Sequence, residues 1–187
     1  MGDYAKAYAA YGKVPGQNPP YELEFNARIK QTEVVPSSNA NKVIKKLRGM
    51  ANSSKNKDYL DQVYYALGNV YLSLKDTVHT IEQYKKGAKE STRNGLEKGV
   101  LLLRLGDLYW NRTDYVKAQE AYKEAIGLIN KEFPGYDVLN KRSEVLDELV
   151  KHVVNVQLQD SLQHLASLSD AERGAAIDKI VAGVKRK

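Results

Sequence analysis

The sequence of 187 residues contains no cysteine, only two phenylalanines and one tryptophan, and no long apolar stretch. The lack of cysteine excludes disulfides and thiolate metal sites, although it does not distinguish the cytoplasm from the periplasm. The longest run of branched aliphatic residues is Val100–Leu103, whereas a membrane-spanning helix needs about 20 apolar residues. The chain also has no phosphate-binding glycine loop, nucleophile elbow or metalloprotease signature.

The polar residues likewise give no sign of catalytic chemistry. The histidines His79, His152 and His164 lie far apart, without the spacing of metal ligands. We therefore predict that the protein is not an enzyme and has no catalytic residue, cofactor or metal. The net charge is +6. With Lys and Arg beside Asp and Glu on the expected helices, we predict a solvated surface of mixed charge and no nucleic-acid partner.

What the sequence does contain is a pattern that occurs twice, with every position shifted by the same offset. Each copy has a large residue, then Leu-Gly, then Tyr, and finally two small residues around an aromatic one. The first copy is Tyr64, Leu67, Gly68, Tyr71, Thr80, Tyr84 and Gly87, and the second is Leu102, Leu105, Gly106, Tyr109, Ala118, Tyr122 and Ala125. This pattern resembles the tetratricopeptide repeat (TPR), a pair of helices whose usual period, about 34 residues, is slightly shorter than the offset here.

The spacing has a physical reason in such a repeat. A glycine inside a helix costs about 1 kcal/mol relative to alanine, so Gly68 and Gly106 indicate a close approach of two helices. Asp76 and Asp114 stand where they can cap the second helix of each copy. The resemblance implies an all-α fold: a TPR-type right-handed superhelical solenoid of antiparallel helix pairs, closed by a long C-terminal capping helix.

The first residues repeat the second-helix pattern without a preceding first helix. We interpret the chain as a fragment of a longer protein, in which residues 3–13 are an orphan second helix capped by Asp3. Its apolar edge, formed by Ala7, Tyr8 and Tyr11, is then expected to be uncovered and to promote self-association.

Residues 21–51 form a degenerate unit, with helices expected over 21–35 and 38–51. The strict alternation of apolar residues from Tyr21 to Ile29 is typical of a strand. We nevertheless predict a helix, because residues that favour helices dominate and the repeat frame requires one. Residues 1–134 are therefore assigned to the repeat array, whose units are 3–13, 21–51, 57–91 and 94–130.

Residues 135–187 are expected to form capping and extension helices. After Pro134-Gly135, apolar residues continue in helical register to Leu165, which predicts one helix of roughly 25–30 residues. The sequence Ser169-Asp170-Ala171-Glu172 is a capping box that begins a last helix. The apolar seam is longer than a cap needs, so we expect Val156–Leu168 to contact another chain or the last helix.

The stretch from Lys57 to Ile180 is also similar to TPR lipoproteins of Bacteroidetes, of the kind associated with gliding motility and type IX secretion. The segments that carry this similarity are Tyr59–Gly68, Gly106–Tyr109, Tyr115–Ala118, Gln157–Leu162 and Ala171–Arg173. The resemblance implies a scaffold in an outer-membrane assembly on the periplasmic face of the cell envelope. It also implies that any contact with the membrane is through a lipid anchor outside this sequence.

The first helices of a TPR array line a concave face where a peptide or helix of a partner protein binds. With the repeated Leu and Tyr anchors in the core, nearby residues are expected to face this groove. They are Tyr65, Asn69, Leu72, Leu103, Asp107 and Trp110. Aromatic residues are common binding anchors, and this set suits a partner that offers apolar side chains and one cation.

An alternative is a cytoplasmic TPR adaptor that holds the peptide tails of partner proteins. Such adaptors use a two-carboxylate clamp of Lys, Asn and Arg on successive first helices. Asn69 suits this clamp, whereas Tyr65 and Leu103 stand where it needs basic groups.

Overall fold

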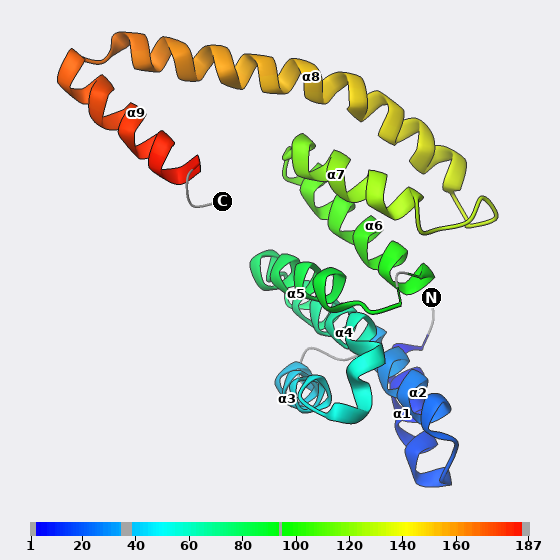
Figure 1. The fold of residues 1–187 in the computed structure, drawn as a ribbon. Helices are drawn as coiled ribbons and strands as arrows, with labels where there is room; N and C mark the ends of the chain where they lie inside the picture. The colour runs from blue at the N-terminus through cyan, green and yellow to red at the C-terminus, as the bar shows by residue number, and fades with distance from the viewer. Residues whose placement is uncertain (1–2, 35–38, 94, 185–187) are drawn as a thin grey trace.

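The computed structural model describes residues 3–34, 39–93 and 95–184, and all its regular elements in these ranges are helices (Figure 1). The helices are α1 (Tyr4–Lys13), α2 (Tyr21–Glu33), α3 (Ala40–Ala51), α4 (Leu60–Ser73), α5 (Thr77–Glu90), α6 (Leu96–Asn111), α7 (Tyr115–Ile126), α8 (Tyr136–Ser167) and α9 (Asp170–Val184), with 3-10 turns η1 (Val14–Gln17) and η3 (Ser54–Tyr59). The all-α fold class predicted from the sequence is confirmed.

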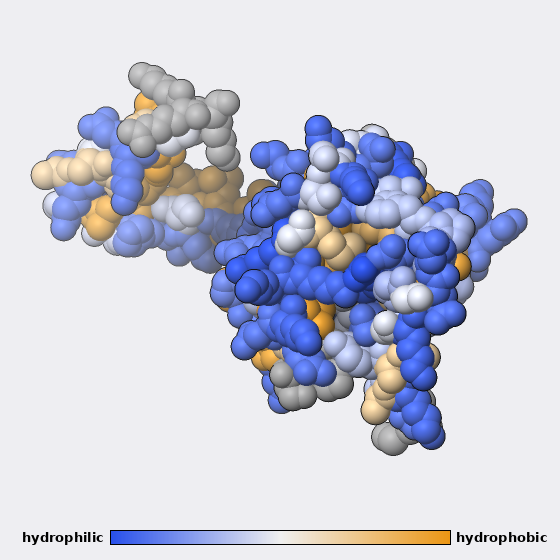
Figure 2. All heavy atoms as spheres, turned by 90° about the horizontal axis from the view of Figure 1, so that it is seen from below, coloured by the Kyte–Doolittle hydropathy of each residue, from blue (hydrophilic) through white to orange (hydrophobic). Residues whose placement is uncertain are grey.

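The helices are stacked in successive tiers (Figure 1). The pairs α4–α5 and α6–α7 are joined by contacts between α5 and α6 and between α4 and α6, and α8 packs on α7. At the other end, α2 packs on α1 and α4, and α3 packs on α4. The face that carries α1–α3 is largely hydrophilic, and the arm formed by α8 and α9 shows apolar patches (Figure 2).

In each of the pairs α4–α5 and α6–α7, a glycine of the first helix packs against a tyrosine of the second. A Cβ atom at Gly68 would lie 2.1 Å from Cε1 of Tyr84, and one at Gly106 would lie 2.6 Å from Cε1 of Tyr122. Both tyrosines are completely buried. The glycines therefore allow the ring of the second helix to lie directly on the backbone of the first, which explains their place in the repeated pattern.

Aspartates begin the second helices, as the sequence predicted. The carboxylates of Asp3, Asp76 and Asp114 accept hydrogen bonds from the backbone N–H groups of Lys6, His79 and Lys117 respectively. These carboxylates bind N–H groups that have no partner within the helix. The orphan helix α1 does not stand apart. Tyr8 packs against the apolar core formed by buried residues of α2, α3 and α4, which we call the first core, and its carbonyl accepts a hydrogen bond of 3.0 Å from Gln31 Nε2.

The degenerate unit is helical, so the choice of helix over strand at residues 21–33 is confirmed. Phe25 and Ile29 are buried in the first core, whereas Tyr21 and Leu23 are about half exposed. The two helices of this unit approach each other much less closely than those of the regular units. The unit lacks a glycine–tyrosine pair like Gly68–Tyr84, and we attribute the separation to that difference.

The C-terminal helix α8 contains 32 residues, slightly more than predicted. Its first half packs on α7 through the buried side chains of Leu139 and Leu146. Its second half extends beyond the array, and α9 turns back at an angle (Figure 1). Arg173 stabilises the corner by donating a hydrogen bond of 2.9 Å to the carbonyl oxygen of each of two residues, Leu165 and Leu168.

The capping box at this corner is formed in part. Glu172 accepts hydrogen bonds from the backbone N–H of Ser169 at 3.1 Å and from its hydroxyl at 2.6 Å. Farther from the corner, Leu158 and Leu162 are about half exposed, so their contact with a second chain stays a prediction. Across the described ranges, no helix is both long enough and apolar enough to span a membrane.

Candidate protein-binding groove

Two adjoining hollows lie over α4, between α2 and α6. Their volumes are about 410 and 650 Å³, and they share Lys30, Glu33 and Tyr65. Most of the lining residues belong to α2, α4 and α6, the first helices of successive units, and Tyr84 of α5 also lines the larger hollow. The hollows together form one groove on the face where the resemblance places a partner, and we call them its apolar end and its polar end.

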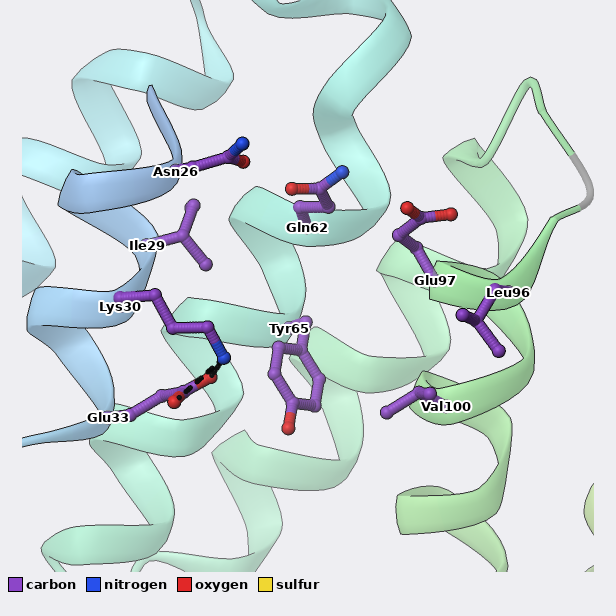
Figure 3. A pocket seen from close by; sticks show the side chains of 9 residues that line it. All are labelled: Asn26, Ile29, Lys30, Glu33, Gln62, Tyr65, Leu96, Glu97 and Val100. Atoms are coloured by element: carbon purple, nitrogen blue, oxygen red, sulfur yellow. Dashed lines mark hydrogen bonds and ion pairs between the residues drawn. The ribbon is translucent and has the colours of Figure 1, made fainter. Parts of the chain in front are cut away.

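The apolar end is centred on Tyr65 (Figure 3). Ile29 of α2 lies on one side of this ring, and Leu96 and Val100 of α6 lie on the other. Tyr65 is half-buried and stacks on Tyr84, with 5.8 Å between the ring centroids. This stacking restrains the ring at the centre of the apolar end.

The polar end contains a tyrosine–amide pair and an arginine. The hydroxyl of Tyr84 donates a hydrogen bond of 2.6 Å to Oδ1 of Asn69. Arg104 of α6 lines the same hollow and is exposed. Within the described part of the chain, this guanidinium forms no ion pair, whereas Lys30 is paired with Glu33 at 3.0 Å.

The next unit also contains a tyrosine hydrogen-bonded to a polar side chain, and there the nearby arginine contacts both residues. The hydroxyl of Tyr122 donates a hydrogen bond of 2.7 Å to Oδ1 of Asp107. Arg142 of α8, which stands one repeat offset after Arg104, contacts the same carboxylate oxygen at 3.4 Å and the hydroxyl of Tyr122 at 3.1 Å. Because Asn69 replaces the aspartate in the earlier unit, Arg104 lacks the carboxylate that Arg142 has.

The two phenols stay protonated donors at neutral pH. Burial, and secondarily the neighbouring Tyr65, raises the pKa of Tyr84 far above its ordinary value of 10.0. Burial and the hydrogen bond to Asp107 raise the pKa of Tyr122 in the same way. Each hydroxyl therefore occupies one acceptor atom of the adjacent Asn or Asp across the ordinary pH range.

Three of the six residues predicted to bind a partner line this groove, namely Tyr65, Asn69 and Leu72. The other three lie around the next layer. Leu103 packs against the apolar core formed mainly by α5, α6, α7 and α8, which we call the second core, and Asp107 binds Tyr122 and Arg142. Trp110 meets Tyr115 edge-on at 5.4 Å and lies under the guanidinium of Arg142 at 5.3 Å.

Sequence reasoning missed the residues of α2 and the outer face of α6, including Lys30, Val100 and Arg104. The signal for Arg104 was present, because the repeat offset connects it to Arg142 in the same way as it connects Asn69 to Asp107. The signal for α2 was weak, because its unit departs from the repeated pattern.

Comparison with known proteins agrees with this architecture. A family model described as tetratricopeptide repeat matches residues 100–132, which include most of α6 and all of α7. No curated protein matches the chain. The chain therefore carries a tetratricopeptide repeat within an all-α, TPR-like helical fold, a class that generally binds other proteins.

The described residues contain no group of three or more His, Asp or Glu side chains that could hold a metal ion. TPR-like folds are typically not enzymes. The features that the structure does provide, a curved helical surface and a groove with an apolar and a polar end, are those of a binding module.

Proposed function

We propose that the protein is a non-catalytic scaffold, and that the groove over α4 binds an extended segment of a partner protein. The continuity of the two hollows across α2, α4 and α6 is the observation that carries this proposal. A segment laid along the groove would contact three successive units. Such a partner is bound by the array as a whole rather than by one helix pair.

The chemistry of the groove favours a segment with one apolar side chain and one carboxylate. The apolar side chain fits between Ile29, Tyr65 and Val100. The carboxylate fits beside Arg104, because Asp107 occupies the corresponding place beside Arg142 one unit later. The sequence predicted that Asp107 would bind a cation of the partner. The carboxylate of Asp107 already binds Tyr122 and Arg142, so we do not include this cation in the proposal.

We propose two cellular locations in which the protein could bind its partner. The resemblance to gliding-motility and type IX secretion lipoproteins supports a role in an assembly at the periplasmic face of the cell envelope. The alternative, an adaptor for peptide tails, would use Lys30, Asn69 and Arg104, which stand on three successive first helices around one hollow; of these, Lys30 is already paired with Glu33. The groove would serve either setting, and fractionation of cells that produce the tagged full-length protein distinguishes them.

The experiment selects peptides from a random library on the purified protein and measures their affinity by fluorescence anisotropy. Arg104→Ala should weaken binding about tenfold or more, because a hydrogen bond to a charged group contributes about 1.5–3 kcal/mol. The matched control is Arg112→Ala, since Arg112 is an exposed arginine outside the groove.

A second variant tests the same site without removing a side chain. Asn69→Asp supplies Arg104 with an internal carboxylate, as Asp107 does for Arg142, so it should exclude the carboxylate of the peptide. The fold should persist, because Tyr84 can donate to either side chain. Unchanged affinity of the selected peptides for both Arg104→Ala and Asn69→Asp would disprove the groove assignment.

A further inference from the structure

The positive charge of the protein is concentrated in one segment. The chain has 29 Lys and Arg against 23 Asp and Glu, and residues 34–57 contain six of the cations and no acidic residue. The rest of the chain therefore holds 23 of each sign, so the net charge of the protein, +6, equals the charge of this segment. The expectation that cations stand beside acids on each helix is wrong for α3.

These cations face solvent because α3 has a strict division between its two faces. Val43, Ile44 and Leu47 are buried in the first core, and Lys42, Lys45, Lys46 and Arg48 are exposed. Across residues 3–34, 39–93 and 95–184, none of the four lysines at positions 42, 45, 46 and 55 forms an ion pair with a carboxylate.

The incomplete closure of α2 on α3 leaves a furrow beside these lysines. Two hollows of about 290 and 190 Å³ lie along it, and both are lined by Arg28 and Lys46. Lys42 lines one hollow and Lys55 the other. The only carboxylate among the lining residues is Glu24, which is already bound by Arg28 with 2.8 Å between Oε1 and Nε. We call this surface, lined by Arg28, Lys42, Lys46 and Lys55, the basic furrow.

The charges around Lys46 are not balanced. Burial is the main cause that lowers the pKa of Lys46, and the positive charges of Arg28 and Lys42 lower it further, whereas Glu24 raises it. An added negative group in the furrow would relieve this repulsion between cations. The furrow therefore has both the shape and the charge to receive acidic side chains.

We propose that the basic furrow is a second interaction surface, separate from the groove over α4, and that it binds an acidic, extended segment of a partner protein. The hollows are of a size for side chains rather than for a duplex. A membrane surface is disfavoured, because the apolar side chains of α3 are buried and cannot insert.

The test uses a fluorescein-labelled peptide in which glutamates alternate with serines, at about 50 mM salt, where charges are weakly screened. The double variant Lys42→Gln/Lys46→Gln should bind it about five- to tenfold more weakly, as expected for two solvent-exposed ion pairs. The matched control is Lys85→Gln/Lys89→Gln, which removes two exposed lysines with the same spacing from α5. This control should bind like the wild type.

Three results would overturn the proposal. The first is the absence of saturable binding by the wild type, or equal binding of a peptide with glutamine in place of glutamate. The second is the same loss in both double variants, which would reflect net charge alone. The third is tighter binding of a DNA duplex or of vesicles containing phosphatidylserine, lost in Lys42→Gln/Lys46→Gln, which would assign the surface to nucleic acid or membrane. Circular dichroism of each variant checks that the fold is retained.

Discussion

Replacing Gly68 by alanine tests the contact that defines the repeat. The added Cβ would lie 2.1 Å from Cε1 and 2.4 Å from Cδ1 of Tyr84. That ring is completely buried, so it cannot move into solvent. Overpacking of this kind costs about 1–3 kcal/mol, and the overlap places Gly68→Ala at the upper end of the range.

A gain in helix propensity of about 1 kcal/mol opposes this cost. We therefore expect Gly68→Ala to lower the free energy of unfolding by about 2 kcal/mol, or the Tm by about 4–8 °C for a chain of this size. Gly106→Ala should lose less, because its Cβ would lie 2.6 Å from the ring of Tyr122. Urea unfolding followed by far-ultraviolet circular dichroism measures both.

Gly49→Ala provides the matched control. Gly49 is also inside a helix, but a Cβ atom added there would meet no atom within 4 Å. Only the propensity gain remains, so this variant should be more stable than the wild type by about 0.5–1 kcal/mol. If Gly68→Ala proved as stable as Gly49→Ala, Tyr84 would not lie on the backbone of α4, and the paired-helix explanation of the repeat would be refuted.

Two further predictions concern Trp110 and Asp76. Removing the guanidinium that covers the indole, in Arg142→Ala, should increase acrylamide quenching of Trp110 fluorescence, whereas Arg104→Ala should not change it. The N–H and ring of His79 hold the pKa of the Asp76 carboxyl below its ordinary value of 3.8. Its stabilising contribution should therefore be complete above about pH 4 and disappear as the pH falls through the lower folded pKa. Asp76→Asn retains a capping residue without this titration. The wild type should therefore be the more stable protein above about pH 4, and the difference in the free energy of unfolding should disappear as the pH falls through the folded pKa of Asp76, as urea unfolding at a series of pH values will show.

The regular units could be predicted because their structure depends on local contacts. Gly68 and Tyr84 belong to consecutive helices, and the pair recurs as Gly106 and Tyr122 with the same separation, so one sequence pattern contains both partners. The caps of the second helices are local too. Apolar residues alternate over residues 21–29 as in a strand, but residues that favour helices dominate this stretch. It forms α2, whose buried residues include Phe25.

The groove could be predicted only in part, because two of its three walls depend on tertiary packing. Tyr65 and Asn69 follow from the pattern of α4. The position of α2 does not, since its unit lacks the glycine–tyrosine contact and α2 packs on α4 instead of closing on α3. The sequence did not predict the basic furrow either, because the furrow depends on the separation between α2 and α3, which is set by tertiary packing.

The difference between Asn69 and Asp107 links the repeat to the proposed function. In both units a buried tyrosine donates a hydrogen bond to this side chain, so either residue preserves the packing. The aspartate also provides a negative charge, which Arg142 contacts, and this ties α8 to the end of the array. The asparagine provides none, and Arg104 is left without a charged partner beside a hollow of about 650 Å³. The exchange of Asp107 for Asn69 thus distinguishes an internal ion pair with α8 from the cationic site at which we propose that a partner's carboxylate binds.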